Sequence, residues 1–172
     1  MKHITLVTGG QRSGKSGYAQ RLALSLSENP VYLATSRVWD EEFRQRVLRH
    51  QKDRGPEWTN IEEEKHLSRH SLAGRVVVID CVTLWGTNFF FDNNSNVELS
   101  LSELKEEFNK FTNQEARFIF VTNELGMGGV AADEVQRKFT DMQGWFNQYI
   151  ASRADEVILM VSGIPVKIKE NK

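Results

Sequence analysis

The stretch Gly9-Gly10-Gln11-Arg12-Ser13-Gly14-Lys15-Ser16 decides the fold, because it fits the phosphate-loop pattern G-x-x-x-x-G-K-[S/T]. It follows an apolar, β-branched run over residues 4–8, which is typical of a buried parallel strand. Behind it, Tyr18, Leu22 and Leu26 recur at helical spacing, and residues 27–30 end the predicted helix. Strand, glycine-rich turn and helix are the context that this motif requires.

Each residue type in this loop has a physical role if a nucleotide is bound. Glycines let the backbone approach a phosphate closely, and the free N–H groups of the loop and of the following helix start favour an anion. Lys15 would reach the β- and γ-phosphates, and the Ser16 hydroxyl would ligate Mg²⁺. A glycine-rich turn with an incidental Lys-Ser pair is the alternative, but it leaves the agreement of motif, strand and helix unexplained.

Composition indicates which binding partners the protein is not expected to attract and in which cellular compartment it is expected. Net charge is -1 and the sequence pI is about 6.4, so no overall positive field attracts nucleic acid or an anionic membrane. Cys81 is the only cysteine and has no internal disulfide partner. With no signal-like or long apolar segment, we expect a cytoplasmic protein without membrane insertion, in which residues 1–172 form a single P-loop nucleotide-binding catalytic domain.

Strand and helix patterns alternate along the rest of the chain. Apolar runs predict strands at residues 31–35, 76–80, 117–122 and 156–161, and a short antiparallel edge strand at 166–168 with its lysines facing water. Asp40 is the predicted N-cap of a helix that runs to about Arg54, helical spacing predicts helices at 97–111 and about 135–154, and residues 92–96 indicate an exposed loop. We therefore expect an α/β fold, a doubly wound, mainly parallel sheet with P-loop NTPase (RecA-like) architecture.

Two further residues are candidates for chemistry. Asp80 ends the strongest predicted strand, where nucleotide enzymes place a carboxylate near Mg²⁺, although a strand-ending Asp can also cap the next turn. His50 shares a helix face with Phe43 and Val47, amid basic side chains. Spacing alone leaves open whether this helix is a solvated face or binds phosphate, and whether His50 is structural or reactive. The basic residues are Arg44, Arg46, Arg49, Lys52 and Arg54.

Several segments taken together resemble the bifunctional adenosylcobinamide kinase / adenosylcobinamide-phosphate guanylyltransferase family of cobalamin synthesis and salvage. The likeness runs nearly end to end, and the blocks at residues 122–128 and 161–169 are much narrower signals than a phosphate loop. The matching segments are Thr8-Gly9-Gly10, Arg12-Ser13-Gly14-Lys15-Ser16, Ala34-Thr35-Ser36, Arg46 with His50, Asp80-Cys81-Val82-Thr83-Leu84-Trp85, Thr122-Asn123-Glu124-Leu125-Gly126-Met127-Gly128, Ala154-Asp155-Glu156-Val157 and Val161-Ser162-Gly163-Ile164-Pro165-Val166-Lys167-Ile168-Lys169.

The resemblance implies two reactions on adenosylcobinamide and its phosphate: phosphorylation, with ATP or GTP as donor, and then GMP transfer from GTP through a guanylylated His50. Lys15 and Asp80 would act with His50 in catalysis, Ser16 and Asp80 would hold Mg²⁺, and Arg46 and Arg49 would counter phosphate charge. The implied nucleotide contacts are Gly9, Gly10, Gln11, Arg12, Ser13, Gly14, Lys15, Ser16, Ala34, Thr35, Ser36, Gln51, Lys52, Asp53, Arg54, Glu62 and Leu84.

The family likeness also implies a homotrimer, and Phe89-Phe90-Phe91 would be interface, corrin contact or, by default, core. The sequence departs from the family pattern at residues 130–132, where many relatives have a proline, and at Gly86, where a larger residue is common. Two alternatives remain. The first is the loss of one half-reaction. The second is a RecA-like nucleotide-gated ATPase or binding module, which near-neutral charge and short length disfavour.

Overall fold

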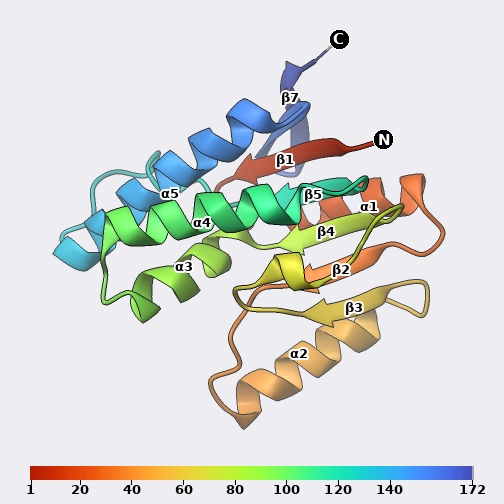
Figure 1. Ribbon diagram of the computed structural model, residues 1–172, viewed down its shortest axis with the longest axis horizontal. Coiled ribbons are helices and arrows are strands. Elements are labelled where there is room, and N and C mark those ends of the chain that lie inside the picture. The colour runs from red at the N-terminus through yellow and green to blue at the C-terminus, as the bar shows by residue number, and fades with distance from the viewer. Residues whose placement is uncertain (172) are drawn as a thin grey trace.

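The computed structural model describes residues 1–171, which form a seven-stranded sheet with helices against it (Figure 1). Strand order is β3-β2-β4-β5-β1-β6-β7, and all neighbouring pairs are parallel except β6 and β7. The strands are β1 His3–Gly9, β2 Val31–Ala34, β3 Thr59–Glu62, β4 Val76–Asp80, β5 Arg117–Val121, β6 Glu156–Val161 and β7 Ile164–Glu170. The predicted fold class is therefore confirmed, including the antiparallel edge strand.

Central strands are buried on both faces, as their continuous apolar runs predicted. In β5, Phe118 and Phe120 point into one core cluster, whereas Ile119 and Val121 point into the other. Helix α1 (Lys15–Leu26) covers the second cluster. The first lies under α3 (Val82–Asp92), α4 (Val97–Phe111) and α5 (Glu134–Arg153), with the 3-10 turn η1 (Leu67–Arg69) beside them.

Helix α2 (Glu41–Asp53) differs from the other helices because none of its residues is buried. It begins where the sequence predicted, since the Asp40 side chain accepts a hydrogen bond from the Phe43 N–H at 2.7 Å. In Figure 1 it lies beyond edge strand β3, away from the helices that cover the centre of the sheet. The helix that carries His50 is thus held by fewer buried contacts than any other.

The sequence patterns did not predict β3 and α3. Strand β3 lies at the edge of the sheet and has no buried residue, so its sequence lacks the apolar run that marks the inner strands. Helix α3 has the opposite character, because buried residues surround most of its circumference and leave no polar face to set a helical period. Within it, Phe89 and Phe90 are core, as expected by default, whereas Phe91 is 54% exposed.

Predicted strand 166–168 is longer in the structure and pairs with β6 through a tight turn. Val161 lies opposite Ile164, so Ser162 and Gly163 alone connect the strands, with φ of 50° and 82°. The lysines of β7 were predicted to face water, but both have protein partners. Lys167 contacts Glu156 and Glu170, and Lys169 donates to the Ala151 carbonyl at 2.9 Å. The remaining exposed side chains of β7 are apolar.

Phe108 provides a test of the larger core. Its ring is fully buried and lies 5.2 Å from the Phe120 ring centroid and 6.3 Å from that of Phe146. We expect Phe108→Ala to lower the free energy of unfolding by about 3–5 kcal/mol in urea titrations, because it removes buried contacts and leaves a cavity. Phe91→Ala is the matched control and should cost about 1 kcal/mol or less. Equal losses in both variants would contradict this core.

Candidate active site

The phosphate loop joins β1 to α1 at the carboxyl end of the sheet. Gly9 has φ of 153°, and a Cβ atom there would lie 2.7 Å from both the Met160 carbonyl oxygen and the Ser13 hydroxyl oxygen. Gly14, at φ of 95°, is the N-cap of α1. The turn between β6 and β7 contacts the loop, because Gly163 N–H donates to the Ser13 carbonyl at 2.9 Å. One of the narrow sequence blocks of the carboxyl-terminal region thus holds the phosphate loop in place.

Lys15 points back into its own loop. Its Nζ donates to the Gly10 carbonyl at 2.5 Å and approaches the Ser13 hydroxyl at 3.5 Å. The side chain is only 7% exposed, and this burial lowers the pKa of Lys15, against the opposing effect of nearby acidic groups such as Asp80. A buried ammonium beside the N-terminus of α1 is well placed to meet an anion.

Asp80 receives two hydroxyl groups on one oxygen. Ser16 Oγ donates to Asp80 Oδ2 at 2.7 Å, and Tyr32 OH donates to the same atom at 2.6 Å. Burial, and then the charge of Asp80, raises the pKa of Tyr32 well above its ordinary value, so the phenol stays a donor at neutral pH. The Arg54 guanidinium carbon lies 3.7 Å from the centre of the Tyr32 ring. Tyr32 therefore connects the end of α2 to the phosphate loop.

Ser16 and Asp80 provide a donor set that suits Mg²⁺. Both offer hard oxygen ligands, and the 2.7 Å separation of the two oxygens lets one cation contact both. No group of three or more His, Cys, Asp or Glu side chains within residues 1–171 could hold a metal ion without other ligands. This fits the usual Mg²⁺ site of phosphoryl-transfer enzymes, where substrate phosphates and waters complete the coordination.

A cleft of about 530 Å³ opens from Ser16 and Asp80 towards α2. His50, which is exposed, lines it from the helix, so the structure brings the predicted nucleophile to the same cleft as the predicted metal ligands. Other predicted site residues that line the cleft are Ala34, Ser36, Arg46, Asp53, Arg54 and Leu84. A smaller adjoining hollow is lined by Arg12, Ser13, Gly14 and Lys15 together with Ser16 and Asp80.

Seven predicted site residues have other surroundings. Thr35 is fully buried, and its hydroxyl accepts from Cys81 N–H at 2.9 Å and donates to the Cys81 carbonyl at 2.7 Å. Gln51 Nε2 donates to Glu62 Oε1 at 2.8 Å, which ties α2 to β3. Arg49 and Lys52 are exposed and do not line the cleft. Gln11 and Gly10 line a separate hollow on the other side of the phosphate loop.

The segment that leads from β2 into α2 is anchored by a charged network. Arg37 donates to both carboxylate oxygens of Asp92 at 2.8 and 3.0 Å, and to Glu64 Oε2 at 3.1 Å. Lys65 Nζ donates to Asp92 at 3.0 Å. The Arg37 and Lys65 hydrogen bonds hold the pKa of Asp92 below its usual range. This network fixes the start of the segment, whereas α2 beyond it has no buried residue.

Sequence reasoning missed Tyr32. The residue lies within an apolar run, where a tyrosine is expected simply to pack, and it is indeed 8% exposed in the second core cluster. Its hydroxyl reaches Asp80 only because β2 and β4 are neighbours, with Tyr32 opposite Val78. No local signal in the sequence indicates that pairing.

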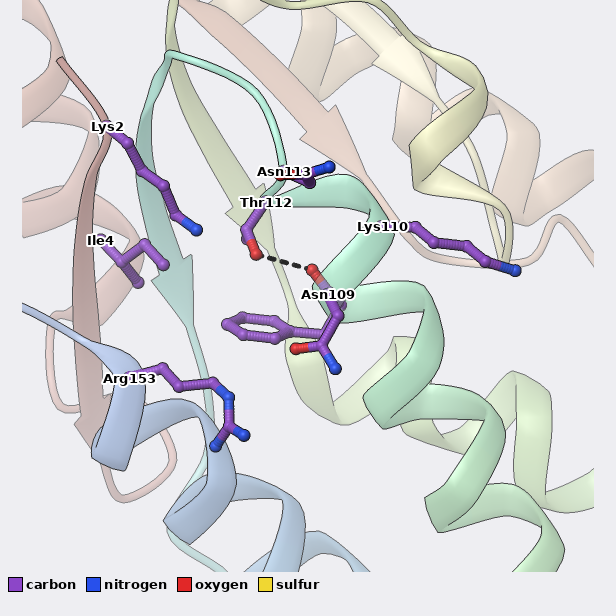
Figure 2. Close-up of a pocket in the computed structure, with 8 residues that line it drawn as sticks. Lys2, Ile4, Asn109, Lys110, Thr112, Asn113 and Arg153 are labelled. Atoms are coloured by element: carbon purple, nitrogen blue, oxygen red, sulfur yellow. Dashed lines mark hydrogen bonds between the residues drawn. The ribbon is translucent and has the colours of Figure 1, made fainter.

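A hollow at the opposite end of β1 lies away from these residues. Figure 2 shows Lys2 and Arg153 on either side of it, with Asn109 from α4. Lys110 and Arg153 belong to the last turns of α4 and α5, where positive side chains complement the helix dipole. Arg153 also lies over the Tyr149 ring at 3.6 Å. Lys110 and Arg153 thus have structural roles, and none of the predicted site residues lines this hollow.

Fold and site together define a P-loop nucleotide-binding protein. Its fold is similar to that of the flagellar accessory protein FlaH from Methanocaldococcus jannaschii, with a TM-score of 0.51 and 16% sequence identity over 99% of this chain and 80% of that one. No helix within the described part of the chain is long and apolar enough to cross a membrane.

Sequence comparison identifies the family. Residues 5–168 match the model of the cobinamide kinase / cobinamide phosphate guanyltransferase family, to which this chain belongs. The bifunctional adenosylcobalamin biosynthesis protein CobU of Escherichia coli is 37% identical over 96% of this chain and 99% of its own length. The corresponding CobP protein of Pseudomonas aeruginosa is 35% identical over 95% and 96%. The resemblance stated from the sequence motifs is confirmed.

Tyr32→Phe tests whether the tyrosine positions Asp80. Without the phenol, only Ser16 restrains the carboxylate, so we expect the Mg²⁺ concentration needed for half-maximal nucleotide binding to rise on the order of tenfold. Binding is measured by calorimetry over a Mg²⁺ series. Tyr149→Phe is the matched control, because the Tyr149 hydroxyl pairs with Asn109 away from the site. An unchanged Mg²⁺ dependence in Tyr32→Phe would show that Tyr32 does not position Asp80 for metal binding.

Proposed function

We propose that this protein is a bifunctional enzyme of cobalamin synthesis and salvage, and that one catalytic domain carries both reactions. It phosphorylates adenosylcobinamide and then transfers GMP from GTP to the product, which gives adenosylcobinamide-GDP. One observation carries the proposal: the exposed His50 and the Ser16–Asp80 pair open onto the same cleft, beside a phosphate loop. Family membership supports both activities.

In the first reaction, the hydroxyl oxygen of the aminopropanol arm attacks the γ-phosphorus of ATP or GTP. A P–O bond forms, the bond to the β-phosphate breaks, and the nucleoside diphosphate leaves with the electron pair. Lys15 and the N–H groups of residues 10–16 hold the phosphates, while Ser16 and Asp80 would hold Mg²⁺. The cation would neutralise charge on the phosphates when bound.

In the second reaction, an imidazole nitrogen of His50 attacks the α-phosphorus of GTP, and pyrophosphate leaves. The phosphate oxygen of adenosylcobinamide phosphate then attacks the same phosphorus, the P–N bond breaks, and His50 is restored. Arg46 and Arg54 line the cleft beside His50 and would counter the triphosphate charge. Cys81 is not suited to this role, since burial raises the pKa of its thiol to about 11.

Guanine contacts are proposed for the cleft walls. Ala34 ends β2 and Ser36 follows it, Asp53 ends α2, and Leu84 lies in the first turn of α3 and is 41% exposed. Gln51 and Lys52 lie near the end of α2, and Glu62, which pairs with Gln51, ends β3; we propose that they contact the nucleotide from this side. Arg49 would join them as a phosphate contact. We place the enzyme in the cytoplasm, where ATP and GTP are available.

His50→Ala separates the two reactions. We expect the variant to lose GMP transfer to adenosylcobinamide phosphate, by a factor on the order of a thousand or more, because the covalent route is removed. Phosphorylation of adenosylcobinamide should persist within about threefold of the original protein, since His50 does not touch the phosphate loop. Each step is assayed with its own substrate by chromatography.

His3→Ala is the control for this experiment, because His3 lies on β1 at the end opposite the phosphate loop. Retained GMP transfer in His50→Ala would refute the guanylyl-histidine route. A wild-type protein that performs only one step would support loss of one half-reaction. Nucleotide hydrolysis without either transfer, stimulated by DNA, would favour the ATPase alternative.

We also propose that the enzyme is a homotrimer. Ile164, Val166 and Ile168 alternate along β7 and are 65%, 44% and 59% exposed, so they form an apolar stripe on an edge strand. Light scattering should give three times the chain mass of 19.8 kDa, and Val166→Lys should lower it. A monomer at micromolar concentration would contradict the trimer.

A further inference from the structure

The loop between β5 and α5 has a fixed base and an exposed tip. At the base, Asn123 N–H donates to Thr83 Oγ1 at 3.0 Å, and Glu124 N–H donates to the Gly9 carbonyl at 2.9 Å. At the tip, Met127 is 79% exposed and Val130 is 87% exposed. The second bond ties this loop directly to the start of the phosphate loop.

No other part of the loop covers the apolar side chains of Met127 and Val130. A Cβ atom added at Gly128 or Gly129 would meet nothing within 4 Å, and Gly129 has φ of 113°. The backbone thus turns outward between Met127 and Val130 and leaves both open to contact. Neither side chain belongs to the core clusters.

Two hollows adjoin the tip, and Leu125 and Gly128 line both of them. The first, about 620 Å³, is lined by Gly10 and Gln11 of the phosphate loop and by Glu124, Leu125 and Met127. The second, about 430 Å³, is lined by Thr83, Leu125, Val130 and Phe139, among others. The first hollow begins beside the Gly10 carbonyl that Lys15 Nζ contacts, which is the end of the loop where a γ-phosphate is held.

We propose that this loop is the corrinoid subsite of the phosphorylation step, with Met127 and Val130 as its apolar contacts and Glu124 as its base. This rests on the proposed function. A corrinoid is a broad macrocycle with apolar flanks and amide arms, so it needs an apolar surface next to, rather than inside, the nucleotide cleft. The His50 cleft opens from Ser16 and Asp80 instead, so the acceptor and His50 approach the nucleotide by different routes.

Glu124 lines the first hollow together with Gly10 of the phosphate loop, which is where this step needs a base. Its Oε1 accepts the Gly126 N–H at 3.2 Å, and its Oε2 accepts no hydrogen bond from the residues that the structure describes. The acceptor hydroxyl gives its proton to Oε2, its oxygen bonds to the γ-phosphorus, and the nucleoside diphosphate leaves with the electrons of the broken P–O bond. Asp80 is less suited to act as this base, because it already accepts two hydroxyl groups and is the proposed Mg²⁺ ligand.

Variants at the loop separate binding from chemistry. In Met127→Ser and Val130→Ser, KM for adenosylcobinamide in the phosphorylation assay should rise about tenfold with kcat nearly unchanged, because buried apolar contact is lost. In Glu124→Gln, kcat should fall about a hundredfold or more with KM nearly unchanged. All three should keep the nucleotide KM and the rate of GMP transfer from preformed adenosylcobinamide phosphate to within about threefold.

Leu24→Ser is the matched control, since Leu24 is 41% exposed on α1. Unchanged KM in both loop variants, with an active wild type, would overturn the subsite while leaving the proposed function intact. A wild type that does not phosphorylate adenosylcobinamide would overturn the proposed function first. A fall in mass in Met127→Ser by light scattering would assign the tip to a contact between chains and overturn the subsite.

Discussion

Two hydroxyl groups donate to one oxygen of Asp80, and this shared acceptor joins the parts of the nucleotide site. Ser16 belongs to the first turn of α1, Tyr32 to β2 and Asp80 to the end of β4, so a single carboxylate connects three elements. A charged acceptor makes each of these hydrogen bonds stronger than a neutral pair. Because Arg54, the residue that follows α2, lies over the Tyr32 ring, the same carboxylate is also linked through Tyr32 to the end of this helix.

The contrast between α1 and α2 suits a domain with two reactions. Helix α1 begins in the phosphate loop and packs its alanines against the sheet, which holds the end of this loop in place. Helix α2 has no buried residue and is held at its ends, by the Arg37 network before it and by Arg54 and Gln51 at its close. Weakly packed elements open and shift at low cost in free energy. We infer that His50 is carried by the more movable helix so that it reaches the nucleotide only for GMP transfer.

Much of this architecture could be predicted from the sequence because the informative elements lie at the centre of the sheet. Residues 4–8 and 76–80 are buried on both faces, which leaves an unbroken apolar signature, and the phosphate loop fixes the turn between strand and helix. Strand β3 was missed because an edge strand needs no apolar run, and α3 because a buried helix has no polar face. The role of Tyr32 could not be predicted, since it depends on the pairing of β2 with β4.

Some of the predicted site residues line the cleft in the structure, and others do not. Ser16, Asp80 and His50 carry motif or family signals, and the structure places them around one cleft. Thr35 carries the same family signal, yet it is fully buried and its hydroxyl, N–H and carbonyl pair with Cys81, Asp80 and Asn88. Arg49 and Lys52 point away from the cleft because successive residues of a helix face different directions.

The most direct test of the account is to identify the covalent intermediate. The protein is incubated with Mg²⁺ and GTP labelled at the α-phosphate, quenched in alkali, digested and analysed by mass spectrometry. The account predicts one GMP adduct on the peptide that contains His50, stable in alkali and released by acid, as a phosphoramidate is. An adduct on any other residue, or GMP transfer to adenosylcobinamide phosphate without a protein adduct, would contradict it.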